Sequence, residues 1–145
     1  MENRYINRYN TFCRSLDNLQ KSRTANPKDD FVLEGTVHNF NLTFDISWKV
    51  MKDILVKVMG ISDFAIGSPR EVLRTAFTNG IISDDTWVSM LRVRNQLAHD
   101  YDGTLETSEF TEIVTSFYNQ FERLKKKAGA YFEDMTDENG GTNKS

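Results

Sequence analysis

The stretch from Arg94 to Tyr101 combines side chains that can bind phosphate, move protons and offer a hydroxyl. Arginine clamps phosphate, histidine exchanges protons near neutral pH, and tyrosine carries a phenolic hydroxyl. Apolar residues recur at helical spacing before and within the stretch, and Asp102-Gly103 follows as a stop signal. On a helix, Arg94 and Tyr101 fall about 20° apart around the axis. Together these residues suit chemistry on a phosphodiester or a nucleotide.

Within this stretch we assign Arg94 as the phosphate clamp and His99 as a general base or acid in RNA cleavage without metal. Asn95, one helical turn before His99, is expected to orient the imidazole, and Asp100 is expected to support the site. One chain supplies one histidine here, so a two-fold dimer would complete the site. The alternative is a structural helix end, in which His99 caps carbonyls and Arg94 pairs with a carboxylate.

The residues before this stretch add candidates for contact with RNA or a nucleotide. The arginines of the two middle helices form a possible local basic patch. Trp87 is near a predicted helix start and is expected to be open enough to stack on a base, whereas Trp48 lies on an apolar stripe and is expected in the core. The candidate contacts are Arg70, Arg74, Trp87 and Arg92.

Composition limits the class of protein. The chain has 145 residues, 39% of them hydrophobic, and a net charge of -3, which favours one soluble globular domain and counts mildly against broad RNA binding. We expect a cytoplasmic protein without a membrane span or signal peptide. Cys13 is the lone cysteine, and His38 has no nearby cysteine or paired histidine, so no metal is predicted. No cofactor-binding loop is visible, and no cofactor is expected.

The elements that must position the stretch are all predicted to be helices, since no segment alternates like a strand. Polar caps, proline and glycine mark the boundaries. The predicted fold is an all-α antiparallel bundle of four to five helices over residues 1–133, with a disordered polar tail over residues 134–145. The expected helices span 3–22, 30–59 and 68–79, then one from about 83 through the stretch, and one at 106–131.

The stretch also carries a resemblance to a known family. Arg94-Asn95, three residues, and His99-Asp100-Tyr101 resemble the arginine, four residues, histidine, any residue, tyrosine motif of HEPN-domain proteins. The HepT-like branch, the "nucleotidyltransferase substrate-binding" proteins encoded beside a minimal nucleotidyltransferase, is the nearer match. Residues 40–49, 68–77 and 80–87 resemble further family segments, and the likeness covers roughly residues 5–130. Asn41 and Asp45 stand where glutamates would be expected.

This resemblance implies an all-α bundle and a homodimer whose cleft holds two copies of the motif. It further implies a HepT-like toxin that cuts RNA, paired with a minimal nucleotidyltransferase as antitoxin, which adds AMP to the motif tyrosine, here Tyr101. The alternative within the same family is a non-catalytic subunit that binds nucleotide or substrate for a partner nucleotidyltransferase. A purely structural interaction bundle is a third possibility, in which Arg94 and His99 would be dispensable.

Overall fold

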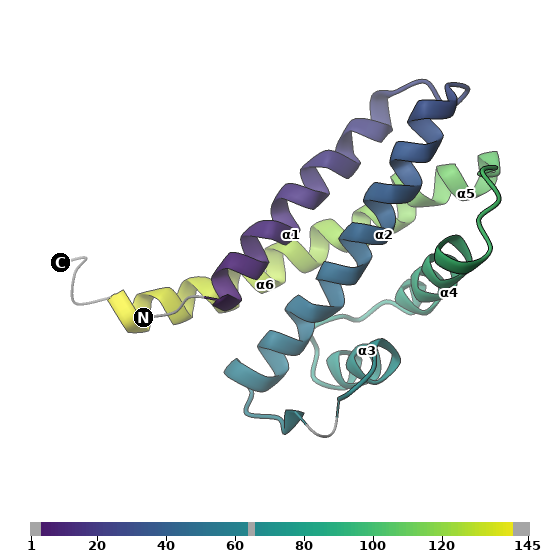
Figure 1. Cartoon of the computed structure of the whole chain (residues 1–145). Coiled ribbons are helices and arrows are strands. Elements are labelled where there is room, and N and C mark those ends of the chain that lie inside the picture. The colour runs from purple at the N-terminus through teal and green to yellow at the C-terminus, as the bar shows by residue number, and fades with distance from the viewer. Residues whose placement is uncertain (1–3, 64–65, 141–145) are drawn as a thin grey trace.

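The computed structural model describes residues 4–63 and 66–140, with side chains to Glu133. Every regular element in these ranges is helical. The long helices α1 (Arg4–Gln20), α2 (Asp30–Asp53) and α6 (Tyr118–Gly140) form the body, and the shorter α3 (Pro69–Thr78) and α4 (Thr86–His99) lie against α2 (Figure 1). The predicted all-α bundle is confirmed.

Two of the long helices pass through a wider π-helical turn. α2 continues into Ile54–Val58, and α5 (Thr107–Glu112) runs through Ile113–Phe117 into α6. The expected fifth helix is therefore one continuous segment in three parts. Its end was predicted near residue 131, but the backbone stays helical to Gly140, past the position where the polar tail was expected to begin. Residues 141–145 of that tail lie outside the described residues.

The predicted starts of α2 and α3 are borne out by their side-chain caps. Asp29 accepts a hydrogen bond from the Phe31 amide at the start of α2. At the start of α3, Ser68 Oγ accepts from the Glu71 amide, and the Glu71 carboxylate accepts from the Ser68 hydroxyl and the Gly67 amide, a close variant of the capping box. Such caps satisfy amides that the first helical turn leaves without partners, which fixes where each helix begins.

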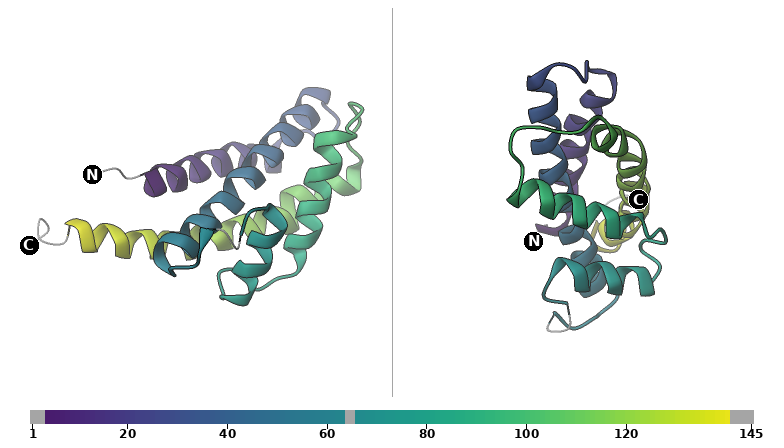
Figure 2. Two further views of the ribbon diagram at one scale, coloured as in Figure 1. Left: turned by 60° about the horizontal axis from the view of Figure 1, so that its bottom comes forward. Right: turned by 90° about the vertical axis from the view of Figure 1, so that its right-hand side faces the viewer.

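An aromatic cluster fills the centre of the bundle and joins α2, α4 and the last helix. Phe40 stacks on Phe117 with ring centroids 5.6 Å apart, and Trp87 meets Phe121 edge-on at 5.7 Å. Trp87 also lies against Phe44 and is only 2% exposed. The cluster holds α4 against α2, and so sets where the Arg94–Tyr101 stretch lies (Figure 2).

Small hydroxyl side chains let α1 and α2 approach closely. Ser15 and Thr43 share a buried hydrogen bond of 2.7 Å, and Ser22 and Thr36 share one of 2.6 Å. Because both members of each pair are satisfied, the contact buries polar atoms without leaving them unpaired. No helix in the described part of the chain is long and apolar enough to cross a membrane.

Candidate functional site

Arg94 is held in place by two neighbours between α2 and α4. Its Nη2 lies 2.8 Å from Asp45 Oδ1, and its Nη1 donates to Asn95 Oδ1 at 3.1 Å. The contact with Asp45 is an ion pair without hydrogen-bond alignment, because Asp45 Oδ1 has no hydrogen-bond partner. The side chains of Arg94 and Asp45 are 25% and 36% exposed, so the pair lies at the edge of the core. The structure thus fixes the guanidinium at one position beside α2.

Four polar side-chain atoms in the middle of α2, in α4 and in the segment after α4 are buried without a hydrogen-bond partner among the described residues. They are Asn41 Oδ1, Asp45 Oδ1, Arg94 Nε and the Tyr101 hydroxyl. Buried polar atoms are nearly always paired, so such a group calls for a specific explanation. One explanation is a ligand whose donors and acceptors complete the set. Asn41 and Asp45, one turn apart on α2, belong to this site together with the motif.

In the sequence, Asn41 and Asp45 stand out only as departures from the family pattern. The signal that could have revealed their place is their spacing, since two short polar side chains stand one turn apart at the edge of the apolar stripe of α2. What the sequence could not show is that this edge meets Arg94.

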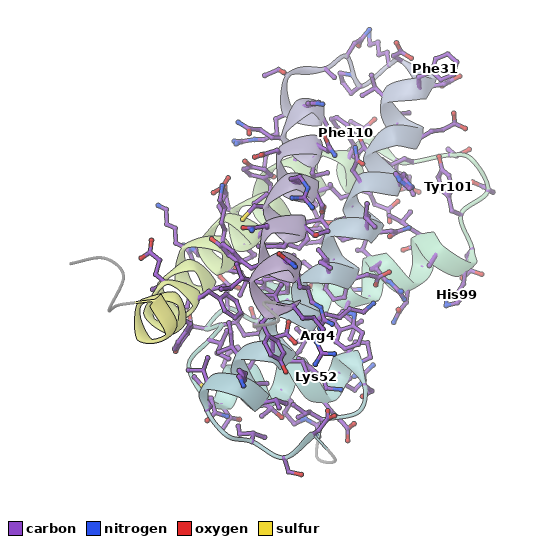
Figure 3. The ribbon with its side chains drawn as sticks, turned by 60° about the vertical axis from the view of Figure 1, so that its left-hand side comes forward. Arg4, Phe31, Lys52, His99, Tyr101 and Phe110 are labelled. Carbon is purple, nitrogen blue, oxygen red and sulfur yellow. The ribbon has the colours of Figure 1, made fainter. Side chains whose placement is uncertain are left out.

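His99 lies at the last residue of α4 and projects into solvent (Figure 3). It makes no hydrogen bond or ion pair with any described residue, so its imidazole is available to a ligand. The expected support from Asn95 is not observed, because the Asn95 carbonyl oxygen accepts from Arg94 instead. Asp100 is exposed and caps α4 through its amide, which donates to Gln96 O at 2.7 Å.

Tyr101 follows α4 and is half-buried beside the first turns of α2 (Figure 3). Its hydroxyl is buried and makes no hydrogen bond with a described residue. Burial raises the pKa of Tyr101, and the charges of Glu34, Asp102 and Asp30 raise this pKa further. The phenol is therefore held in its neutral form in an acidic environment.

The other residues predicted to contact RNA or a nucleotide are not part of this site. Trp87 is not open to a nucleotide base, because it is part of the aromatic core, and that prediction is wrong. Arg70 and Arg74 lie on α3 along a surface groove rather than beside Arg94. Arg92 is exposed on α4. Among the side chains that the structure describes, in residues 4–63 and 66–133, no group of three His, Cys, Asp or Glu could hold a metal ion.

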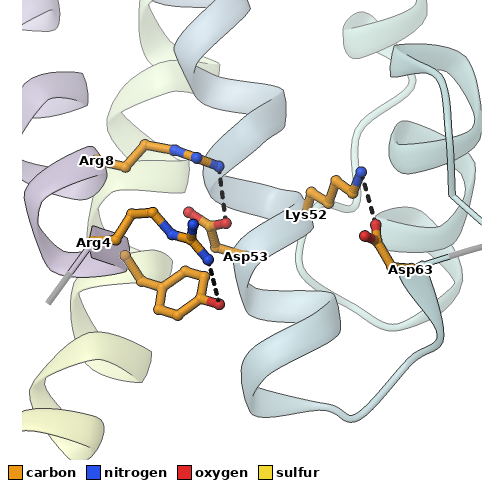
Figure 4. A network of polar contacts seen from close by, with 6 residues as sticks. Arg4, Arg8, Lys52, Asp53 and Asp63 are labelled. Atoms are coloured by element: carbon orange, nitrogen blue, oxygen red, sulfur yellow. Dashed lines mark hydrogen bonds and ion pairs between the residues drawn. The ribbon is translucent and has the colours of Figure 1, made fainter. Parts of the chain in front are cut away.

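A second polar cluster joins the start of α1 to the end of α2. Arg8 Nη1 lies 2.9 Å from Asp53 Oδ1, and Lys52 Nζ lies 2.8 Å from Asp63 Oδ1 (Figure 4). Asp53 is 5% exposed, and its second oxygen is buried without a partner. Burial raises the pKa of Asp53 from 3.8 to about 6, although Arg8 and other cations oppose this shift.

This raised pKa makes stability depend on pH. The folded protein keeps the Asp53 proton where the unfolded chain has lost it, so the contribution is complete below about pH 4 and is lost as pH rises to about 6. We expect the free energy of unfolding of wild type, relative to Asp53→Asn, to fall by on the order of 2 kcal/mol across this window. Urea denaturation of both proteins at several pH values measures it. A constant difference between them would contradict the account.

The chain is thus a small all-α protein that carries Arg94, His99 and Tyr101 at one end of α4, at the edge of the core. A family model described as "Nucleotidyltransferase substrate binding protein like" matches residues 5–130. The chain therefore belongs to this nucleotidyltransferase substrate-binding-like family, with which the HEPN and HepT-like resemblance is consistent. The family name implies association with a nucleotidyltransferase. A comparison with curated proteins finds no match.

Proposed function

We propose that this chain is a HepT-like toxin that cuts RNA without metal, as a homodimer, and is silenced by a partner nucleotidyltransferase. The observation that carries the proposal is the pairing of a fixed guanidinium with a free imidazole at one end of α4. Asp45 and Asn95 engage the two terminal nitrogens of Arg94, while Nε lacks a partner. His99 is exposed and makes no contact with described residues.

In the proposed reaction, a base removes the proton of a ribose 2′-hydroxyl, and the resulting oxygen attacks the adjacent phosphorus. The bond to the 5′-oxygen breaks, an acid protonates that oxygen, and the products are a 2′,3′-cyclic phosphate and a 5′-hydroxyl. Arg94 would stabilise the crowded phosphate, and an RNA oxygen would supply the partner that Nε lacks. His99 would serve as the base or the acid.

The homodimer follows from the need for two proton-transfer groups. One protomer places one imidazole beside Arg94 in this proposal, while a two-fold axis would bring a second His99 to the same cleft. Asp100, exposed beside His99, would then lie at the rim of the shared site.

Silencing is proposed to occur by AMP transfer to Tyr101. The phenolic oxygen would attack the α-phosphorus of ATP bound by the partner, pyrophosphate would leave, and the phenolic proton would pass to a base of the partner. The bound AMP would occupy the space beside Arg94 with a fixed anion. Because the Tyr101 hydroxyl is buried among acidic residues, the segment after α4 must open before the partner can reach it.

A second function is supported by the same burial. A neutral, unpaired Tyr101 hydroxyl, together with the unpaired atoms of Asn41 and Arg94, suits hydrogen bonding to a bound nucleotide or substrate. In this alternative the chain completes a partner nucleotidyltransferase and cuts nothing, which agrees with the family description.

Growth of a bacterial host separates the two functions. We expect wild type to arrest growth and degrade total RNA, and co-expressed nucleotidyltransferase to relieve both effects. Relief should fail for Tyr101→Phe, which retains the ring but cannot accept AMP. Normal growth with intact RNA at confirmed soluble expression would contradict the ribonuclease and favour the binding subunit.

A further inference from the structure

A groove between α3 and α4 is lined mainly by apolar side chains and is not used by the proposed site. Its volume is about 310 Å³. Leu73, Ile82 and Leu91 are buried lining residues, whereas Phe77 is 46% exposed and Val88 is 59% exposed. Large apolar side chains left in water beside a hollow are a frequent mark of a protein-binding surface.

The charges of this groove are unbalanced. Arg70 and Arg74 stand one helical turn apart on α3, and neither makes an ion pair with a described residue. The carboxylate that also lines the groove, Asp84, is already engaged, because it accepts hydrogen bonds from Thr86 and Gln120. The two guanidinium groups are therefore the charges that an occupant would meet.

These features favour a protein helix over RNA as the occupant. RNA would place phosphates along a basic track, but Phe77 and Val88 would remain in water beside such a backbone. An amphipathic helix buries its apolar side chains in a groove between two helices and can present carboxylates to the arginines at the rim. Arg70 and Arg74 were predicted to contact RNA. Their place along this groove favours contact with a carboxylate-bearing partner instead.

We propose that this groove docks an acidic amphipathic helix of the partner nucleotidyltransferase. The inference rests on the proposed partnership and adds the place of contact. Val88 lies eleven residues before His99 on the same helix, a separation of about 16 Å. A partner domain bound at the start of α4 would thus be large enough to reach Tyr101, which follows the end of α4. Docking at one place and modification at another allows the partner to hold this chain while the segment around Tyr101 opens.

The test measures binding of purified chain to the minimal nucleotidyltransferase encoded in the same genome neighbourhood, by titration calorimetry. We expect wild type to bind, and both the Arg70→Glu/Arg74→Glu variant and Val88→Glu to raise Kd by about 100-fold. The double variant places negative charge against the acidic helix of the partner, and Val88→Glu places a carboxylate within the apolar contact. Lys126→Glu/Lys127→Glu, on the exposed surface of α6, matches the double charge change and should bind as wild type does. Circular dichroism establishes that each variant is folded.

Three results would overturn the docking proposal. Unchanged Kd values for both groove variants would show that the partner binds elsewhere, with the partnership intact. Equal weakening by the α6 control would show that only net charge matters. Absence of binding by wild type would remove the partnership itself. If the groove variants bind the partner normally but lose affinity for a labelled single-stranded RNA, the groove is a nucleic-acid surface instead.

Discussion

Replacing Arg94 or His99 by alanine is expected to lower the rate of RNA cleavage by roughly 10²–10⁴-fold, and His99→Ala is expected to leave stability almost unchanged. Arg94 would lose its contact with the phosphate, and His99→Ala would remove a proton-transfer group that is exposed and makes no structural contact with the described residues. The rate is measured on a labelled RNA with purified protein in EDTA.

The chain offers a matched control for each of these variants. Arg14→Ala removes an exposed arginine from α1, and His38→Ala removes the other histidine of the chain. We expect both controls to cleave within about threefold of wild type, because no hydrogen bond or ion pair of the described residues joins either side chain to Arg94, Asp45 or His99. If His99→Ala cleaves at the wild-type rate, or if the controls fall as far as the site variants, the assignment of Arg94 and His99 is wrong.

The second large effect is on stability. Trp87→Ala is expected to lower the free energy of unfolding by about 3–5 kcal/mol, because it would leave a cavity between Phe44 and Phe121. Trp48→Ala is expected to cost clearly less, since Trp48 is only half-buried at the edge of the core. Chemical denaturation of the two variants under one buffer condition compares them. Equal losses would contradict the placement of the two tryptophans.

These two tryptophans show what the sequence could and could not predict. Trp48 lies on the apolar stripe of α2, so periodicity predicted burial, but its position on the stripe is the flank rather than the centre. Trp87 stands near a helix start, where side chains are often open. It is buried because α4 crosses the bundle at that point, against Phe44 and Phe121, and a single helix pattern holds no information about such a crossing.

Helix boundaries were predictable where local chemistry determines them. Ser68 and Glu71 cap α3 as their spacing indicates, and Gly60 takes the left-handed φ of 70° after the second helix. The end of α6 was not predictable in this way, because the polar residues after Glu133 do not forbid a helix. Its backbone extends to Gly140.

Only some residues of the candidate site could be predicted from the sequence. The motif residues Arg94, His99 and Tyr101 were identified by type and spacing, and all three lie at one end of α4 or just beyond it. The partner of Arg94 was not identified, since Asp45 is 49 positions away and its approach depends on how α2 and α4 pack. The contact expected between Asn95 and His99 is not observed, because Asn95 Oδ1 accepts a hydrogen bond from the neighbouring Arg94 while His99 lies in solvent.

The most direct measurement of the central claim is the chemistry of the RNA ends that the purified protein produces in EDTA. The account predicts fragments with a 2′,3′-cyclic phosphate and a 5′-hydroxyl, and no cleavage at a position where a single 2′-deoxynucleotide replaces the ribose. Intact RNA from a folded, partner-free preparation would contradict it. So would cleavage that depends on added metal, or cleavage that proceeds at the deoxynucleotide.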